Sequence, residues 1–383
     1  MTGRTGPVVK AAAVTAIIGP LVIAFLAAVI SQRPSDLAVA AAALLILAVL
    51  AADAAIIVRG RKGPAAAALV THVVLASFLM TYRASPLPPP APFAAVLPPA
   101  SPPADMAVFA LLTGVTHRTA SFGYRGGSFL DRRDFSMTAA LVRHPQGDLL
   151  IDTGLGREID KQFQTQTFSF RALTRYELFK PAADQLDAAG YDRKHLRAIL
   201  ITHAHWDHTS GLPDFPGTPI LVTAPEHRFI QEGGWLTVIA RGVPDARYRE
   251  YGFEGGPYLG FPASHDVYGD GSIVVVPAPG HTPGSVVVFV VLPNQRRYAF
   301  IGDLAWQSEG ISERELRPWL IRRLGRENPD EARENILRMA AIAAKYPSLV
   351  IVTAHDGRSF AGVPALPARF ADAPSASGDD TRK

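Results

Sequence analysis

A run of six residues, HAHWDH at positions 203–208, follows directly after the apolar segment 196–202. An apolar segment of this length is typical of a buried strand, and the turn after such a strand often carries functional side chains. Histidine and carboxylate are the ligand types that zinc and its neighbouring transition metals prefer. The chain has only 11 histidines and no cysteine, so every metal ligand must be nitrogen or oxygen. The run therefore predicts a metal site at the end of a strand.

Three further candidate ligands stand in turns that follow later apolar segments. The segments 273–276, 298–301 and 349–352 are followed by His281, Asp303 and His355. Each of these residues alone is explained as easily by an ordinary buried hydrogen bond. Together with the run at 203–208, they indicate one site assembled from the ends of several strands.

The order of these motifs resembles that of the metallo-β-lactamase superfamily. The resemblance covers about residues 105–365 and rests on HAHWDH, PGHTPGS at 279–285, Gly302-Asp303, the AHD ending at 354–356 and IDTG at 151–154. It implies an α/β fold, the αββα sandwich, with a binuclear metal centre among the loops at the ends of its two sheets.

The same resemblance implies a role for each candidate residue. One metal would be bound by three imidazoles: His203, His205 and His281. The second metal would be bound by Asp207, His208 and His355. Asp303 would bridge both metals, Asp207 and Asp303 would be the catalytic carboxylates, and Asp152 would orient the ligands from behind.

The residue types and their spacing indicate the same chemistry independently of the family resemblance. His203 and His205 alternate along an extended turn, so they face the same side and can bind one ion, while Asp207 and His208 face a second ion. Two metals about 3.5 to 4 Å apart can share one water, lower its pKa and polarise the bond under attack. This suits hydrolysis of an ester, lactone, thioester, amide or phosphoester. No Gly-x-Ser-x-Gly motif offers a competing serine nucleophile.

Two details refine the resemblance. His205 differs from the glutamate typical of the diiron branch, which favours two zinc ions, although other divalent transition metals would suit the same ligands. The AHD ending resembles acyl-homoserine-lactone lactonases and their relatives. These enzymes usually carry a tyrosine three residues after the bridging aspartate, where this chain has Trp306. An indole N–H donates a hydrogen bond but cannot act as a phenolic acid. Trp306 is therefore a candidate for contact with the substrate that cannot supply the proton a tyrosine would.

Two functions of different classes follow from this pattern. The first is a membrane-anchored zinc hydrolase of a small-molecule, ester-like substrate such as a lactone; thioesterase, β-lactamase-like and phosphodiesterase activities are further alternatives. The second is a membrane sensor or binding protein that holds metal without turnover. A nucleic acid partner is not expected, because the net charge is only +4 and no basic stripe accompanies the metal motifs. The oligomeric state stays open.

The first 83 residues explain the high apolar content of 48%. The runs 11–30, 37–58 and 65–82 are each close to the roughly 20 apolar residues that cross a bilayer as a helix. Positive residues near the N-terminus and at 59–62 place both segments in the cytoplasm. We therefore expect residues 1–83 to be a multi-pass anchor in the lipid bilayer of the cell membrane, with the following domain on the extracytoplasmic side. The roles of Asp53 and His72 within these runs stay open.

The rest of the chain divides into three parts. Residues 84–104 form a linker, and nine prolines between positions 85 and 103 favour an extended spacer. The hydrolase domain is expected at 105–369, and residues 370–383 are expected to be disordered. Strands are predicted in the domain at 106–112, 138–142, 148–151, 198–202, 220–223, 273–276, 285–292, 298–301 and 349–352. Helices are predicted at 182–189, 225–239, 313–324 and 329–345.

Aromatic residues flank the metal motifs in two segments. Phe163, Phe168 and Phe170 follow Asp152, and a second set precedes His281: Trp235, Tyr251, Phe253 and Tyr258. Both sets could line an apolar substrate groove. Core packing is an equally good explanation for each of them.

Overall fold

The structure is a computed structural model that describes residues 62–91 and 93–370. The chain forms two compact units. The smaller unit contains α3 (Lys62–Met80) and α4 (Ala120–Gly123). The larger unit contains both β-sheets and the predicted metal ligands, and it covers most of residues 87–370.

Two sheets form the centre of the larger unit. The first has seven strands. Their order across the sheet is β4 (Tyr176–Leu178), β1 (Ala107–Thr119), β2 (Arg132–Arg143), β3 (Asp148–Ile151), β5 (Leu196–Leu200), β6 (Ile220–Thr223) and β7 (Tyr248–Tyr251). The second has five strands. Their order is β12 (Val350–Val352), β11 (Arg297–Phe300), β10 (Val286–Val291), β9 (Ile273–Pro277) and β8 (His265–Asp266).

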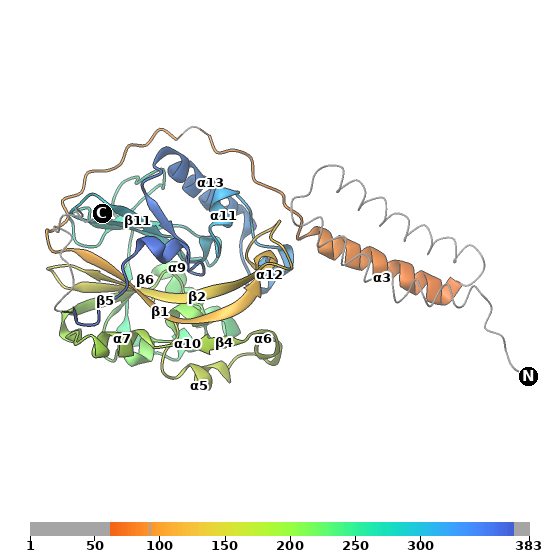
Figure 1. The fold of residues 1–383 in the computed structure, drawn as a ribbon, viewed down its shortest axis with the longest axis horizontal. Coiled ribbons are helices and arrows are strands. Elements are labelled where there is room, and N and C mark those ends of the chain that lie inside the picture. The colour runs from red at the N-terminus through yellow and green to blue at the C-terminus, as the bar shows by residue number, and fades with distance from the viewer. Residues whose placement is uncertain (1–61, 92, 371–383) are drawn as a thin grey trace, which may run out of the picture. The chain divides into compact units, whose positions relative to one another are not determined.

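Apolar side chains pack on both faces of each sheet, as the continuous apolar strands require. All six residues of β10, the middle strand of the second sheet, are buried. A core of Val and Leu side chains from β3, β9 and β10 lies between the two sheets. The outer face of the first sheet is covered by α7 (Ala182–Ala188) and α10 (Val238–Arg241), and that of the second by α13 (Pro329–Lys345). Figure 1 shows these helix, sheet, sheet and helix layers, the predicted αββα sandwich.

The strand directions explain where the predicted ligands gather. In the first sheet β3 and β5 run parallel. In the second sheet β9 and β11 both pair antiparallel with β10, and β12 runs parallel to β11. The carboxyl ends of these strands therefore meet at one edge of each sheet, and the turns that follow them carry the candidate ligands.

Most elements lie close to their predicted positions, and two predicted helices are wrong in extent. The helix predicted at 225–239 ends early, because α9 (Ala224–Glu232) is followed by two glycines and Gly234 has a φ of +67°. The helix predicted at 313–324 is two short helices, α11 (Glu309–Ser312) and α12 (Trp319–Leu324). Arg314 ends the first with a φ of +55°, and Pro318 prevents the intervening residues from continuing it. The short strands β4, β7 and β8 were not predicted.

The remaining helices of the larger unit are short. They are α5 (Ile159–Phe163), α6 (Phe168–Leu173) and α8 (Trp206–Thr209).

The proline-rich segment is extended, as predicted, but it packs on the hydrolase domain and is no free spacer. Leu87, Phe93 and Leu97 contact the core beneath α13. The Tyr346 hydroxyl donates to the Ala95 carbonyl at 2.7 Å, and the Phe93 ring contacts Tyr346 edge-on at 6.4 Å. The apolar side chains placed between the prolines are what allow this segment to add to the core.

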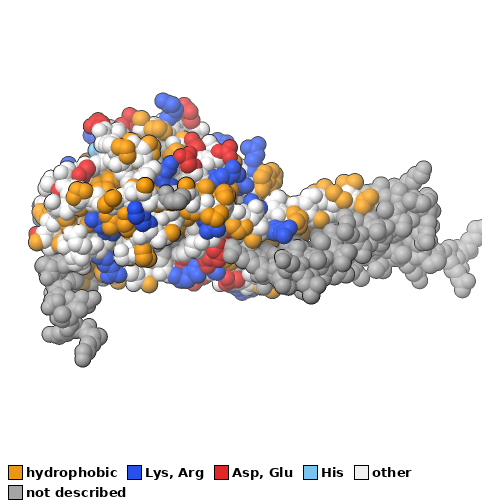
Figure 2. Space-filling view, turned by 90° about the horizontal axis from the view of Figure 1, so that it is seen from above, with side chains coloured by type: hydrophobic (Ala, Val, Ile, Leu, Met, Phe, Trp, Pro, Cys, Tyr) orange, Lys and Arg blue, Asp and Glu red, His pale blue; other side chains and the backbone are white. Residues whose placement is uncertain are grey.

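The smaller unit contains the third predicted membrane span, 65–82, as the helix α3. Three valines on this helix, Val70, Val73 and Val74, are 44 to 61% exposed, and Figure 2 shows apolar side chains along it. In the part of the chain that the structure describes, no helix combines the length and the apolar character needed to cross a membrane. The third span is therefore not confirmed. The predicted spans 11–30 and 37–58 and the tail at 371–383 lie outside the described residues.

Candidate metal centre

The turn after β5 is folded so that its four ligand candidates face inward. His205 has extended backbone angles and precedes α8 as its N-cap, so His203 and His205 lie on an extended stretch and project to the same side. The single turn of α8 then brings Asp207 and His208 toward the same space. The Thr209 hydroxyl donates to the His205 carbonyl at 2.8 Å, which closes the turn.

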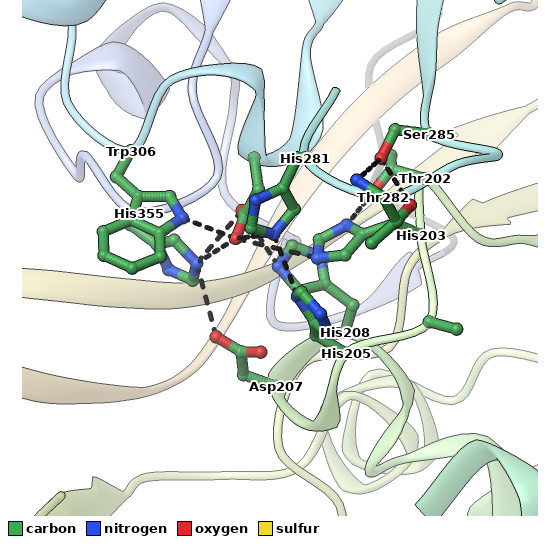
Figure 3. Close-up of polar contacts among 12 residues, drawn as sticks. Thr202, His203, His205, Asp207, His208, His281, Thr282, Ser285, Trp306 and His355 are labelled. Carbon is green, nitrogen blue, oxygen red and sulfur yellow. Dashed lines mark hydrogen bonds and ion pairs between the residues drawn. The ribbon is translucent and has the colours of Figure 1, made fainter. Parts of the chain in front are cut away.

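Two groups of ligand atoms result, each with its members within 4.8 Å of one another. The first group is His203, His205, His281 and Asp303, and the second is Asp207, His208 and His355. In the first group His205 Nδ1 lies 2.9 Å from His281 Nε2. In the second group His355 Nε2 lies 3.3 Å from an oxygen of Asp207. Figure 3 labels the five histidines and Asp207 and shows their side chains turned toward one another. The structure thus brings together all seven residues that the sequence predicted.

Asp303 stands between the two groups. Its Oδ2 lies 3.2 Å from His281 Nε2 and 3.6 Å from His203 Nε2. Its Oδ1 lies 3.1 Å from Nε2 of both His208 and His355. Oδ2 also lies 3.3 Å from His355 Nε2. The carboxylate therefore contacts imidazoles of both groups, as a bridging ligand must. Gly302 permits this position, because its φ is +50° and a Cβ there would come within 2.8 Å of Thr202 Oγ1.

The donor atoms fit a pair of divalent cations. None of the seven residues exposes more than 8% of its surface. Within the described part of the chain, Nε2 of His203 and Nε2 of His208 lie near the Asp303 carboxylate but make no hydrogen bond to it or to any other group, and leaving buried polar atoms unbonded is costly. Burial lowers the pKa of His203 well below its ordinary value, so its imidazole is neutral and can donate a lone pair. Burial alone would raise the pKa of Asp303, but the surrounding imidazoles, His355 foremost, hold it well below its usual range.

A second layer of hydrogen bonds orients the ligands. Asp152, the predicted orienting residue, accepts the His208 Nδ1–H at 2.8 Å and both the N–H and the hydroxyl of Thr202 at 2.7 Å. Its φ of +56° is unusual for a residue other than glycine. His355 donates from Nδ1 to the Ser136 carbonyl at 2.7 Å. These bonds direct the Nε2 atoms of both histidines toward Asp303.

Glu226 is a site residue that the sequence did not predict. This buried carboxylate lies on α9 and accepts hydrogen bonds from two ligand turns: from the Ala204 N–H at 2.7 Å, and from the Thr282 hydroxyl at 2.6 Å and the Gly284 N–H at 3.0 Å. It joins the turn of His203 and His205 to the turn of His281. Burial raises the pKa of Glu226, although these donors oppose the rise.

Trp306 lies against the candidate metal centre. Its indole N–H donates to Asp303 Oδ2 at 2.6 Å, and its ring meets those of His281 and His355 nearly edge-on at 6.3 and 6.0 Å. Its polar atom is therefore directed at the Asp303 carboxylate. The predicted role on the substrate side stays a prediction.

The first predicted aromatic set forms a cluster beside the ligand turn. Phe163 and Phe170 lie 5.8 and 5.7 Å from the ring of Trp206, which stands between His205 and Asp207 in the chain. Phe170 also contacts Trp235 at 5.4 Å, and Phe168 on α6 is 80% exposed. The other members of the second set pack in the cores: Tyr251, Phe253 and Tyr258.

Comparison with known proteins agrees with this geometry. Residues 133–355 match the model of the metallo-β-lactamase superfamily. A probable metallo-hydrolase of Mycobacterium tuberculosis is 31% identical over 229 residues, which are 56% of this chain and 73% of that protein. The N-acyl homoserine lactonase AttM of Rhizobium radiobacter is 26% identical over 235 residues, 60% of this chain and 86% of that protein.

Solved structures show the same fold. An N-acyl homoserine lactone hydrolase with N-hexanoyl-L-homoserine bound at its catalytic metal centre superimposes with a TM-score of 0.54. The match has 17% sequence identity and covers 68% of this chain and 97% of that one. With the family match over more than half of its length, this chain is a member of the metallo-β-lactamase superfamily of metal-dependent hydrolases.

Proposed function

We propose that this protein is a two-zinc hydrolase of small ester-like substrates. The observation that carries the proposal is the position of Asp303, whose carboxylate contacts buried imidazoles of both ligand groups. One cation would be held by His203, His205 and His281, the other by Asp207, His208 and His355, with Asp303 shared. Only nitrogen and oxygen ligands are present, a set that suits zinc and does not exclude neighbouring divalent metals.

The bound cations would supply an activated water and an electrophile for the substrate carbonyl. The chain itself supplies the geometry. Asp152 and Ser136 fix the rings of His208 and His355, and Trp306 restrains the Asp303 carboxylate. Burial keeps bulk water away from these groups, so their charges act with little screening.

The substrate we favour is a lactone or ester that carries an apolar chain. The aromatic cluster of Phe163, Phe170, Trp206 and Trp235 begins at the ligand turn itself and offers an apolar surface beside the cations. The lactonase name of the relatives that are 26% identical agrees with this choice. Because Trp306 offers no phenolic proton, substrates with good leaving groups, such as thioesters and aryl esters, belong in the same test.

The test is hydrolysis of a substrate panel by the zinc-loaded, full-length protein. The panel contains N-acyl lactones of increasing chain length, aryl esters, thioesters, a β-lactam and a phosphodiester. We expect His205→Ala to lower kcat/KM by more than about 100-fold. This is a larger loss than is expected for a residue that only hydrogen-bonds to a metal ligand. The exposed His117 supplies the matched control, His117→Ala, which should leave kcat/KM unchanged.

A different outcome would change the functional class. If the protein bound its full complement of metal and hydrolysed no panel member in a manner that depends on His205, a metal-containing sensor or binding protein would be the better description. Preferential hydrolysis of the thioester, the β-lactam or the phosphodiester would keep the hydrolase proposal and reassign its substrate.

We also propose that the protein is held at the cell membrane with the hydrolase domain on the extracytoplasmic side. The three apolar runs at 11–30, 37–58 and 65–82 and the positive residues around them support this, because three crossings from a cytoplasmic N-terminus end on the outer side. An alkaline phosphatase reporter fused after Asp105 should be active in cells. An inactive reporter, together with an active cytoplasmic reporter at the same position, would reverse the topology.

A further inference from the structure

We propose that Glu327 is a positioning residue for His281 and that the connection between α12 and α13 is built to hold it. The inference rests on the proposed function, because it concerns how one metal ligand is oriented. Glu327 belongs to none of the motifs that point to the site, and it stands 46 residues after His281. The structure nevertheless places its carboxylate directly behind that imidazole.

The contact is short and shielded from solvent. Glu327 Oε1 lies 3.0 Å from His281 Nδ1, and the two side chains expose only 1 and 2% of their surface. On the other side of the ring, His281 Nε2 lies 3.2 Å from Asp303 Oδ2. A carboxylate can only accept, so Nδ1 carries the proton and Nε2 presents its lone pair to the candidate metal position.

Backbone contacts hold the two turns together. The Asn328 N–H donates to the Gly280 carbonyl at 2.8 Å, and the Asn335 side chain donates to the Pro279 carbonyl at 2.8 Å. Gly280 has a φ of +132°, and a Cβ there would lie 2.4 Å from the backbone nitrogen of Ala332. Only glycine allows the turn of His281 to approach α13 this closely.

The turn that carries Glu327 is itself constrained. Arg326, the residue before it, has a φ of +56°, a conformation that side chains other than glycine, asparagine and aspartate adopt rarely. Asn328 then caps α13 by accepting from the N–H groups of Asp330 and Glu331. Strain of this kind persists only where the surroundings enforce it. Here the outcome is a carboxylate aimed at His281.

The expected consequence is a more basic and better oriented ligand at the first metal position. A charged hydrogen bond fixes both the tautomer and the ring angle of His281. We expect the sandwich fold to persist without this bond, because Ala332, Ile336 and Met339 pack α13 against the core.

The test compares zinc affinity in Glu327→Ala, Glu327→Gln and the control Glu334→Gln, an exposed carboxyl on α13. Affinity is measured by competition with a chromophoric chelator, and the cobalt-substituted proteins are compared by their visible absorption spectra. We expect Glu327→Ala to weaken binding of one cation about 10- to 100-fold and to change the cobalt spectrum. Glu327→Gln keeps an acceptor oxygen, so its affinity should lie between those of Glu327→Ala and the wild type. Glu334→Gln should match the wild type.

The outcomes separate this inference from the proposed function. If the wild type binds two cations and both Glu327 variants bind them with unchanged affinity and spectra, Glu327 has no positioning role. If the wild type itself binds no cation, the proposed function fails first. Should Glu327→Ala not fold, as judged by circular dichroism of the metal-free protein, the isosteric Glu327→Gln variant alone decides: weaker binding supports the role, and wild-type binding overturns it.

Discussion

At the scale of single residues, the candidate centre depends on polar groups that each have one defined partner. Asp303 faces both imidazole groups, Asp152 orients His208, and Trp306 donates to Asp303. Such contacts matter because a buried hydrogen bond to a charged group contributes about 1.5 to 3 kcal/mol. Replacing either partner leaves the other buried without it.

Trp306→Phe tests the hydrogen bond to the Asp303 carboxylate. The phenyl ring keeps most of the packing against His281 and His355, whereas Asp303 loses its indole donor. We expect kcat/KM to fall about 10- to 100-fold, in line with the worth of one charged hydrogen bond. Steady-state kinetics on the best panel substrate measure this. Trp319→Phe, at an exposed position, is the control, and unchanged kinetics in Trp306→Phe would remove the proposed restraint.

Glu309 provides a pH prediction away from the ligands. Burial alone would raise its pKa, but hydrogen bonds from Arg358 and Arg133 hold the pKa below its ordinary value of 4.5. A carboxyl whose folded pKa is depressed stabilises the protein above its unfolded pKa, and this stability is lost as the pH falls through the folded pKa. The stabilisation from Glu309 should therefore be complete above about pH 4.5 and should decline below it.

Glu309→Gln should remove that part of the acid dependence. Chemical denaturation at a series of pH values from neutral to acidic measures it. The variant should be less stable than the wild type at neutral pH, and the difference should shrink in acid. Glu232→Gln, at an exposed position of α9, should show no such trend. A difference that stays constant with pH would contradict the assignment.

At the scale of elements, the site is formed by the turns that follow four strands and by two helices that hydrogen-bond to those turns. The carboxyl ends of β5, β9, β11 and β12 deliver the ligands, and α9 and α13 join the turns through Glu226, Asn328 and Asn335. The helices therefore do more than cover the sheets.

Gly280→Ala tests the docking of α13 on the turn of His281. The new Cβ would lie 2.4 Å from the Ala332 nitrogen at a φ of +132°, so the turn or the helix must move. We expect a loss of about 1 to 3 kcal/mol in the free energy of unfolding, measured by chemical denaturation. Gly256→Ala is the control, since a Cβ there meets no atom within 4 Å. Equal stability of the two variants would show that the close approach is not needed.

The ligands could be predicted from the sequence because each lies in the turn that follows an apolar strand segment, and the ends of these strands meet at one edge of each sheet. Glu226 and Glu327 could not, because they act by hydrogen bonds to segments distant in sequence and no local pattern marks them. The edge strands β4, β7 and β8 have only three, four and two residues. Strands this short cannot show a periodic apolar pattern. Pro318 and the Gly233-Gly234 pair were available signals for the two misjudged helices.

At the scale of the whole molecule, the proline-rich segment belongs to the hydrolase domain. Phe93 packs against Tyr346 and the core beneath α13. Phe93→Ala should therefore cost about 1 to 2 kcal/mol of unfolding free energy, less than full burial of a phenylalanine because its ring is only partly buried. Differential scanning calorimetry of the full chain measures it, with Val96→Ala, at a 77% exposed position, as the control. An unchanged free energy of unfolding in Phe93→Ala would show that the segment is a free spacer.

The proposed activity depends on two cations shared through Asp303. The most direct measurement is the metal content of the purified full-length protein after zinc loading and removal of loosely bound ions, determined by inductively coupled plasma mass spectrometry. We predict two zinc equivalents per chain for the wild type and a loss of tightly bound zinc in Asp303→Ala, with the variant still folded by circular dichroism. A wild type that holds fewer than two equivalents, or a folded Asp303→Ala variant that keeps both, would contradict the account.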